Sequence, residues 1–344
     1  MRIAYFSGGA NSIGRGFCIW LIASELGWEC VPIVPEGQSW TPLAGSQFGS
    51  SLAPYRGSES SCYVGTDLVI CYQAVPETMN PAAELSERLG VPILLDVDEP
   101  HWEARYGFSR MQQLRVVLGM LRRGRNPAPY HVLRRKARGL PAIVSNPCLL
   151  EIYPGTVIPH VRKKQPFRAP SVQRLARLRV AFVGTPRPEK GIAELRAACA
   201  NVGAELHITA DCPDTPHENE VWHGETTIED GTRILDTCHV VAIPSWETPF
   251  RRAQLPVKLI DAMLAGKAIV ASDLPPIRWA LGDTGALVPP GRADVLARAL
   301  AQIGEDPDLA LELGRSARER ASRLFTPQVV APLFRAAVED ALRG

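Results

Sequence analysis

The sequence predicts an α/β protein with two doubly wound parallel sheets, one in each half of the chain. Short apolar strands alternate with helical segments before residue 160, and the same alternation restarts after residue 178. A length of 344 residues is enough for two domains. We expect the two halves to face each other across a cleft, with ligands at the carboxyl ends of the strands.

Runs of apolar and β-branched residues define the expected strands. In the first half they are 2–6, 30–34, 67–72, 91–95, 142–145 and 156–159. In the second half they are 179–183, 205–209, 221–223, 239–243 and 268–271. Helices are expected between the strands, including 17–26 and a segment around 81–89, and the chain is expected to be helical from 293 on.

The basic segment 162–178 contains prolines and shows no regular apolar period, so it is the predicted linker. We therefore predict an N-terminal domain over 1–165 and a C-terminal domain over 166–325. A last helix, 326–344, is expected to pack back on the N-terminal domain.

Composition excludes several classes of protein. A net charge of +2 argues against a nucleic-acid binder that relies on bulk charge. The eight cysteines form no Cys-x-x-Cys pair, which argues against a zinc site and favours reduced thiols. No apolar run approaches the roughly 18–20 residues that span a bilayer. The chain starts directly with a strand, so we expect no signal peptide and a cytoplasmic location.

Residues 244–270 carry the strongest indication of a binding site. They are predicted to form a strand end, a loop, a helix with Pro256 near its first turn, and a C-terminal stop at Gly266. Lys258 and Asp261 are three residues apart and share a face near the helix start. Free N–H groups and a lysine bind anions, and a carboxylate one turn further can hold a sugar hydroxyl. This combination suits a nucleotide diphosphate.

A second loop, 183–191, closes the first strand of the second half. Gly184 allows the backbone to turn tightly, and Arg187 and Lys190 are expected to point into the mouth of the cleft. The alternative is a solvated loop before a helix.

Together the two segments resemble the donor-binding region of GT-B glycosyltransferases of family 4, the glycosyl transferases group 1. The usual motif is a Glu, seven residues, and then Glu-Ala-Met-Ala-x-Gly-x-Pro-Val-Val. Asp261 stands at the second Glu, and the first Glu falls on Ala253, so half of the motif is missing. The resemblance implies a GT-B fold and a retaining, metal-independent transfer of sugar from a nucleotide-diphosphate donor, with no other cofactor.

The resemblance also implies roles for individual residues. The second domain would bind the donor and the first the acceptor. Arg187, Lys190 and Lys258 would stabilise the leaving diphosphate, and Asp261 would hold the ribose. This chain departs from the family at the first Glu, and we expect backbone groups of 252–254, or the side chain of Arg251 or Arg252, to take its place. The expected donor-binding residues are Gly8, Gly9, Gly184, Thr185, His223, Gly224, Arg252, Ala253, Gln254, Leu255 and Asp261.

The glycine loop 7–14 has two interpretations. It resembles the Thr-Gly-x-x-x-Gly-x-Gly of short-chain dehydrogenases, but Ser12 replaces the middle glycine and no Tyr-x-x-x-Lys accompanies it. The family resemblance instead places Gly8 and Gly9 near the donor phosphates or the acceptor. A dehydrogenase is the last alternative.

Two acids and a histidine follow the predicted strand 91–95. Asp96-Val97-Asp98 matches the metal-binding Asp-x-Asp of GT-A transferases, but two Rossmann-like halves favour the metal-independent class. His101 is a candidate catalytic residue for acceptor contact or proton handling. The alternative is a helix N-cap cluster with a surface histidine.

His223 and Gly224 follow a strand and precede a helix, as in the nucleoside-contact loop of the family. The resemblance therefore implies contact with the base. A plain connecting loop is the alternative.

The segment 110–138 contains many basic residues, no acid, and interleaved apolar residues. Such a surface suits anionic lipid, at about 1 kcal/mol per basic residue near a charged membrane. We therefore expect peripheral contact with the inner face of a membrane. An acidic acceptor and a solvated helix face are the alternatives.

The expected partners are a UDP, GDP or dTDP sugar and a glycan, lipid-linked or small-molecule acceptor. Two further classes stay open: a nucleotide-sugar binding protein without turnover, and a GT-B sugar-nucleotide epimerase. The sequence determines neither the nucleotide nor the sugar, acceptor or linkage.

Overall fold

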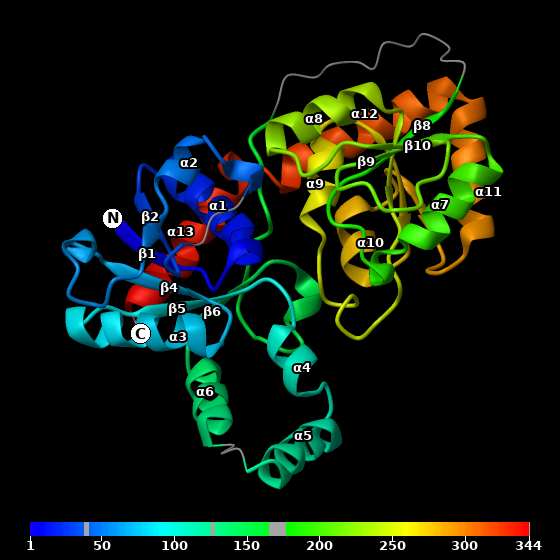
Figure 1. Cartoon of the computed structure of the whole chain (residues 1–344). Helices are drawn as coiled ribbons and strands as arrows, with labels where there is room; N and C mark the ends of the chain where they lie inside the picture. The colour runs from blue at the N-terminus through cyan, green and yellow to red at the C-terminus, as the bar shows by residue number, and fades with distance from the viewer. Residues whose placement is uncertain (38–40, 125–127, 165–176, 344) are drawn as a thin grey trace. The chain divides into compact units, whose positions relative to one another are not determined.

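The computed structural model describes residues 1–37, 41–124, 128–164 and 177–343, and the chain divides into two compact units (Figure 1). Unit 1 comprises 1–40, 45–161 and 327–344, and unit 2 comprises 41–44 and 162–326. Each unit contains one parallel sheet, so the predicted α/β fold class with two Rossmann-like sheets is confirmed. Of the predicted linker 162–178, residues 165–176 lie outside the described residues.

Unit 1 has seven strands in the order β3-β2-β1-β4-β5-β6-β7, and every paired strand is parallel. The strands are β1 (Arg2–Phe6), β2 (Glu29–Val34), β3 (Ala53–Pro54), β4 (Leu68–Tyr72), β5 (Ile93–Val97), β6 (Ala142–Val144) and β7 (Thr156–Val157). The chain order reverses between β1 and β4, which makes their carboxyl ends the topological switch point of this sheet.

The helices of unit 1 cover both faces of its sheet. They are α1 (Ala10–Glu25), α2 (Gln47–Ser50), α3 (Pro76–Leu89), α4 (His101–Tyr106), α5 (Arg110–Arg122), α6 (Ala128–Arg138) and α13 (Pro327–Arg343). One core joins Ile19 and Ile22 of α1 to Phe334 and Val338 of α13 and to Ile70 of β4. Helix α3 lies on the opposite face of the sheet (Figure 1).

Unit 2 has six strands in the order β10-β9-β8-β11-β12-β13, also parallel throughout. The strands are β8 (Arg179–Phe182), β9 (Glu205–Ile208), β10 (Glu220–Trp222), β11 (Val240–Ile243), β12 (Ala268–Ser272) and β13 (Ala286–Val288). The helices are α7 (Ile192–Asn201), α8 (Ile228–Thr237), α9 (Val257–Leu264), α10 (Pro275–Leu281), α11 (Ala293–Glu305) and α12 (Pro307–Leu324).

Successive side chains of β8 point to opposite faces of the sheet, so they belong to two different hydrophobic cores of unit 2. Phe182 packs with Leu195 of α7 and Leu296 of α11. Ala181, which points to the other face of the sheet, packs with Leu259 of α9 and Ala317 of α12. Both faces are thus covered, as parallel sheets require.

The structure corrects the prediction of a glycine loop over 7–14. Helix α1 already begins at Ala10 and continues through Gly14 and Gly16. A Cβ at Gly16 would lie 2.9 Å from Cε1 of Tyr5, so this glycine allows the helix to approach β1 closely. Gly16 therefore reflects tertiary packing, which outweighs the weak helix propensity of glycine.

Two short strands, β3 and β13, were not predicted. They contain two and three residues and lie at sheet edges, where a short run carries little apolar pattern. Among the described residues, no helix has the length and apolar character needed to cross a bilayer.

Candidate functional site

The switch point of unit 2 brings the two predicted donor loops together. Strands β8 and β11 are neighbours although they are far apart in the sequence, with Val180 opposite Val240. The loop 183–191 follows β8 and the loop 244–256 follows β11. Ligands of doubly wound sheets bind at the carboxyl ends of strands beside such a reversal.

Gly184 forms the turn that directs the first loop. Its φ of +100° lies in the region that favours glycine. Its N–H donates to Oγ1 of Thr209 over 2.8 Å, and a Cβ at Gly184 would lie 3.9 Å from Nζ of Lys258. The turn therefore passes directly beside a lysine of the second segment. The neighbouring Thr185 is exposed.

Lys258 is the second residue of α9, which follows the N-cap Pro256. Its ammonium donates to the carbonyl of Val183 over 2.8 Å and lies 4.2 Å from the ring centre of Phe182. Burial, followed by the charges of Lys190 and Arg251, lowers the pKa of Lys258 well below its ordinary value. At the other end of α9, Gly266 has a φ of +70° directly after the C-cap Ala265.

Lys190 and Arg251 complete a cluster of cations with Lys258. Burial lowers the pKa of Lys190 to about 8, and Arg187 and Arg251 contribute further. The side chain of Arg251 is only 13% exposed, and its Nη2 lies 3.6 Å from Oε1 of Glu189. Arg187 is exposed. Perturbed lysines that repel one another are a sign of a functional site, because an anion would relieve the repulsion.

The carboxylate of Asp261, predicted to hold a ribose, is engaged within unit 2. Its Oδ1 lies 2.9 Å from Nε of Arg162, and the side chain of Asp261 is 30% exposed. Arg162 is nearly buried and its N–H donates to the carbonyl of Phe325. Arg162 thus fixes the orientation of Asp261, a partner that sequence spacing did not indicate.

The loop 244–256, which lacks the first Glu of the family motif, contains both buried and exposed residues. Ala253 and Leu255 are buried in the core of unit 2. Arg252 is exposed and pairs with Glu247 at 2.5 Å. Gln254 accepts a hydrogen bond from Arg251. Arg251 and Arg252 were both expected to replace the missing Glu. Of these two, Arg251 lies near Lys190 and Lys258.

His223 forms a pair with His207, a residue that no sequence motif indicated. Its Nε2 lies 3.0 Å from Nδ1 of His207, and the two rings stack at 5.2 Å. The other nitrogen of His207 is 2.7 Å from Oε1 of Glu205. Burial, followed by the charge of His207, lowers the pKa of His223. Gly224, with a φ of +72°, turns the chain directly afterwards.

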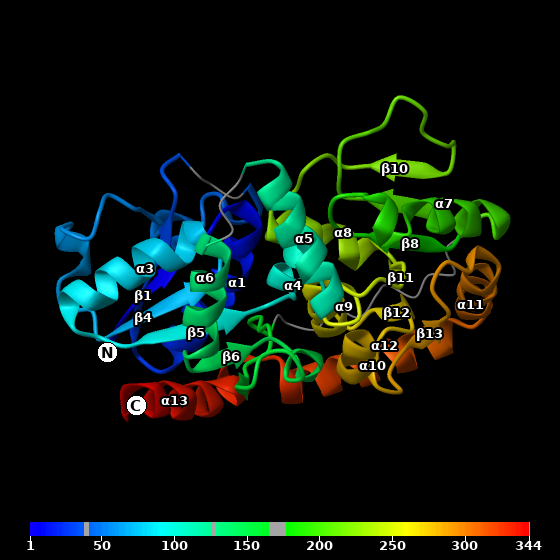
Figure 2. The same ribbon diagram turned by 90° about the horizontal axis from the view of Figure 1, so that it is seen from below.

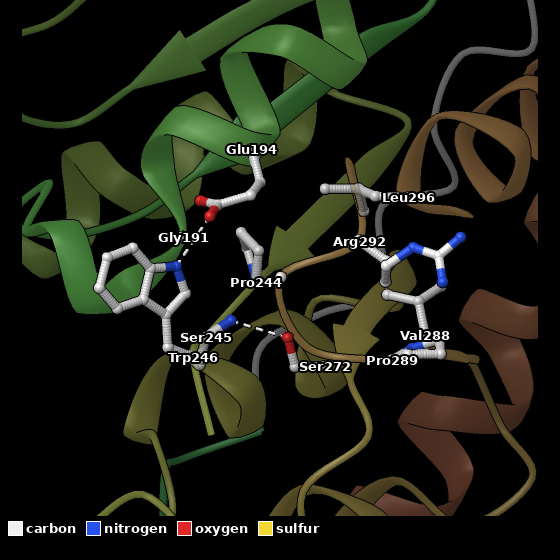
Figure 3. A pocket seen from close by; sticks show the side chains of 11 residues that line it. Gly191, Glu194, Pro244, Ser245, Trp246, Ser272, Val288, Pro289, Arg292 and Leu296 are labelled. Carbon is white, nitrogen blue, oxygen red and sulfur yellow. Dashed lines mark hydrogen bonds between the residues drawn. The ribbon is translucent and has the colours of Figure 1, made fainter. Parts of the chain in front are cut away.

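A small hollow is lined by Gly191, the residue after Lys190, and by residues of the loop after β11 (Figure 3). Nε1 of Trp246 donates to Oε1 of Glu194 over 2.9 Å, and the N–H of Ser245 donates to Oγ of Ser272 over 2.8 Å (Figure 3). These bonds hold the loop after β11 against α7 and β12. The lining of the hollow includes Gly191 but neither Lys190 nor Lys258.

We predict that Gly191→Ala destabilises unit 2 by about 1–3 kcal/mol. Gly191 has a φ of +67°, and an added Cβ would lie 2.9 Å from Cβ and 3.1 Å from the backbone of Pro244. Gly203→Ala is the matched control, because Gly203 has a φ of +64° with nothing within 4 Å of the added atom. Urea unfolding measures both, and equal losses would show that the contact with Pro244 carries no cost.

In unit 1, the predicted site residues occupy separate places. Gly8 is the second residue after β1, where an added Cβ would lie 3.1 Å from Cγ2 of Thr78, and Gly9 precedes α1. His101 is the first residue of α4, with a side chain 44% exposed and Nδ1 3.5 Å from Oε1 of Glu99.

The carboxylates of the Asp-x-Asp pair are both engaged by cations. Asp96 is fully buried and accepts hydrogen bonds from Arg15 at 2.9–3.1 Å and from the hydroxyl of Tyr5 at 2.9 Å. Asp98 lies 2.8 Å from Nε2 of His160. Burial alone would lower the pKa of His160, but Asp98 raises it to about 9.

The pair of His160 and Asp98 predicts a stability change at alkaline pH. The pKa of His160 rises from 6.5 to about 9 on folding, so its contribution is complete below pH 6.5 and lost as pH passes 9. We expect the unfolding free energy of the wild type, relative to His160→Gln, to fall by about 3 kcal/mol over that window. Urea unfolding at several pH values measures this difference. A constant difference would contradict the prediction.

Comparisons with known proteins connect this geometry to a family. Residues 173–306 match the family model of glycosyl transferases group 1. The resemblance predicted from the sequence is thereby confirmed. A D-rhamnosyltransferase, WbpZ of Pseudomonas aeruginosa, is 26% identical over 190 residues, 49% of this chain and 49% of its own length. The chain spans about half or less of the length of the curated relatives it matches, 21 to 49%.

Solved structures extend the likeness in fold to almost the whole chain. Sucrose-phosphate synthase from Thermosynechococcus elongatus has a TM-score of 0.71 at 17% identity, over 99% of this chain and 98% of that one. The Anabaena protein HepE, solved with UDP and glucose, has a TM-score of 0.69 at 15% identity, over 99% of this chain and 100% of that one. The chain has the GT-B fold.

Proposed function

We propose that this protein is a glycosyltransferase that moves a sugar from a nucleotide-diphosphate donor to a carbohydrate or lipid-linked acceptor. The observation that carries the proposal is the cluster of Lys190, Arg251 and Lys258 at the switch point of unit 2. The family match over 173–306 and the transferase named among the relatives support it. HepE was solved with UDP, and we propose a UDP sugar as the donor.

The cluster suits a leaving diphosphate. When the bond between sugar and phosphate breaks, negative charge develops on the diphosphate. Lys190, Lys258 and Arg251 would stabilise that charge, and the start of α9 would contribute its dipole. Preorganised donors of this kind are typically worth about 3 kcal/mol each. We propose a retaining reaction of family 4 type. In it, these protein cations would stabilise the charge on the leaving diphosphate, which a metal ion does in other transferases.

Other residues would position the two substrates. Arg162 orients the carboxylate of Asp261, which we propose for the ribose. His223 and Gly224 would contact the base. In unit 1, Gly8 and Gly9 would lie by the donor phosphates, and His101 would contact the acceptor. The protein would need no cofactor besides its donor and would work in the cytoplasm.

A thermal-shift panel of UDP, GDP, dTDP and ADP tests this proposal. A nucleotide present at 100 times its dissociation constant should raise the unfolding free energy by about 2.7 kcal/mol. We expect the largest shift with UDP. Absence of a shift with all four nucleotides would overturn the proposal.

One observation favours a second candidate, a nucleotide-sugar binding protein without turnover. Ala253 stands where the family carries its first Glu, and Ala253 is buried. Such a protein would show the nucleotide shift but neither transfer nor slow hydrolysis of the donor. Release of UDP from UDP-sugars, with and without acceptors, separates the two candidates.

A further inference from the structure

Helix α5 presents a continuous apolar stripe to solvent. Met111, Leu114, Leu118 and Leu121 are 66, 57, 43 and 54% exposed. Their spacing of three, four and three residues places them on one face of the helix. None of the residues of α5 is buried. Large apolar side chains that gather in this way mark an interaction surface.

Cations flank the stripe on both sides. With about 3.6 residues per turn, Arg115 and Arg122 lie along one border of the stripe and Arg110 along the other. Residues 110–124 contain no acid, and the second helix of the segment, α6, adds Arg135, Lys136 and Arg138. An apolar face with basic borders is the pattern of helices that lie in a membrane interface.

The start of α5 is structurally fixed. Ser109 and Gln112 form a capping box, and Gln113 donates to the carbonyl of Gly107 over 3.0 Å. A Cβ at Gly107 would lie 2.5 Å from Cβ of Gln112, so the chain is tightly turned just before the helix. The helix is therefore presented in a defined orientation, set off from the sheet of unit 1 (Figures 1 and 2).

We propose that α5 docks this protein on an anionic lipid bilayer. The stripe would enter the boundary between head groups and acyl chains, and the flanking arginines would contact the lipid phosphates. Charge complementarity selects this occupant, because a second copy of the same face would bring arginines against arginines. Docking would hold unit 1 at the surface where a lipid-linked acceptor resides, and in that respect it deepens the proposed function.

Vesicle flotation with the full chain tests the docking. One vesicle is phosphatidylcholine alone, and the other contains about 30 mol% phosphatidylglycerol, an anionic lipid that gives the vesicle a negative surface potential. We expect at least tenfold stronger binding to the anionic vesicle and a loss of at least tenfold in the variant Leu114→Ser/Leu118→Ser. The matched control is Val329→Ser/Leu333→Ser on α13, whose side chains are 41 and 50% exposed. It should bind like the wild type.

Several results would overturn the proposal: no binding to anionic vesicles, equal binding to both vesicles, or undiminished binding of the α5 variant. If sedimentation shows a dimer that the α5 variant dissociates, the stripe serves self-association and the lipid proposal is wrong. Nucleotide thermal shifts of the α5 variant should equal those of the wild type. A failure of docking is thus distinguishable from a failure of the proposed function.

Discussion

Replacing Asp96 with alanine is expected to destabilise unit 1 by about 3–5 kcal/mol, because the change leaves Arg15 buried without its counter-charge. Both side chains are fully buried. Arg15 donates to Asp96 through two nitrogens and to the carbonyl of Ile158 over 2.8 Å. Asp96 raises the pKa of Arg15, although burial opposes this, so the guanidinium cannot escape the cost by losing its proton.

The double variant Arg15→Leu/Asp96→Ala is the control for this prediction. Replacement of a whole buried ion pair by apolar groups is often close to neutral, whereas removal of one partner is not. The double variant should therefore be more stable than Asp96→Ala alone. Hydrogen exchange of peptides from β1 and β5 reports the stability of unit 1 directly. If the two variants exchange equally fast, the isolated charge is not the source of the loss.

Asp96 also shows which contacts cannot be predicted from the sequence. Asp96-Val97-Asp98 matched a metal-binding pattern, and only the fold revealed that Arg15 and His160 engage the two acids. Arg15 is 81 residues from Asp96 in the sequence. Local spacing predicts which residues share a face of one element. It does not predict which elements bring their side chains together.

The strands of the sheets were easier to predict than the starts of the helices. A buried parallel strand is a short run of apolar residues, which is visible without knowledge of the fold. The start of α1 was not visible, because Gly16 has a packing role that depends on Tyr5. The motif also indicated Lys190 and Lys258, but the partners Arg162 and His207 required three-dimensional contacts.

Lys190→Ala is expected to lower kcat/KM for sugar transfer by about 10²–10³, the cost of removing one preorganised donor from a transition-state anion. Lys190 is partly buried, and its pKa of about 8 reflects burial and the nearby arginines. Arg187→Ala is the control within the same loop. Arg187 is exposed, so solvent screens its charge and its loss should cost less. Nearly intact transfer in Lys190→Ala would contradict the phosphate role.

The pKa of Lys190 also predicts the alkaline limb of the pH profile. Above about pH 8 the free enzyme loses the proton from Lys190, and a neutral amine cannot stabilise the leaving diphosphate. The wild-type kcat/KM should therefore fall above pH 8. Lys190→Arg should keep its charge to much higher pH, because guanidinium groups stay protonated. The part of the alkaline fall that Lys190 causes should therefore be lost, even if the absolute rate is lower, and any remaining fall is expected from Lys258, whose pKa is also lowered. If kcat/KM falls identically at alkaline pH in both proteins, the loss of a proton from another group causes the fall. Lys190 would then position the donor rather than stabilise its charge.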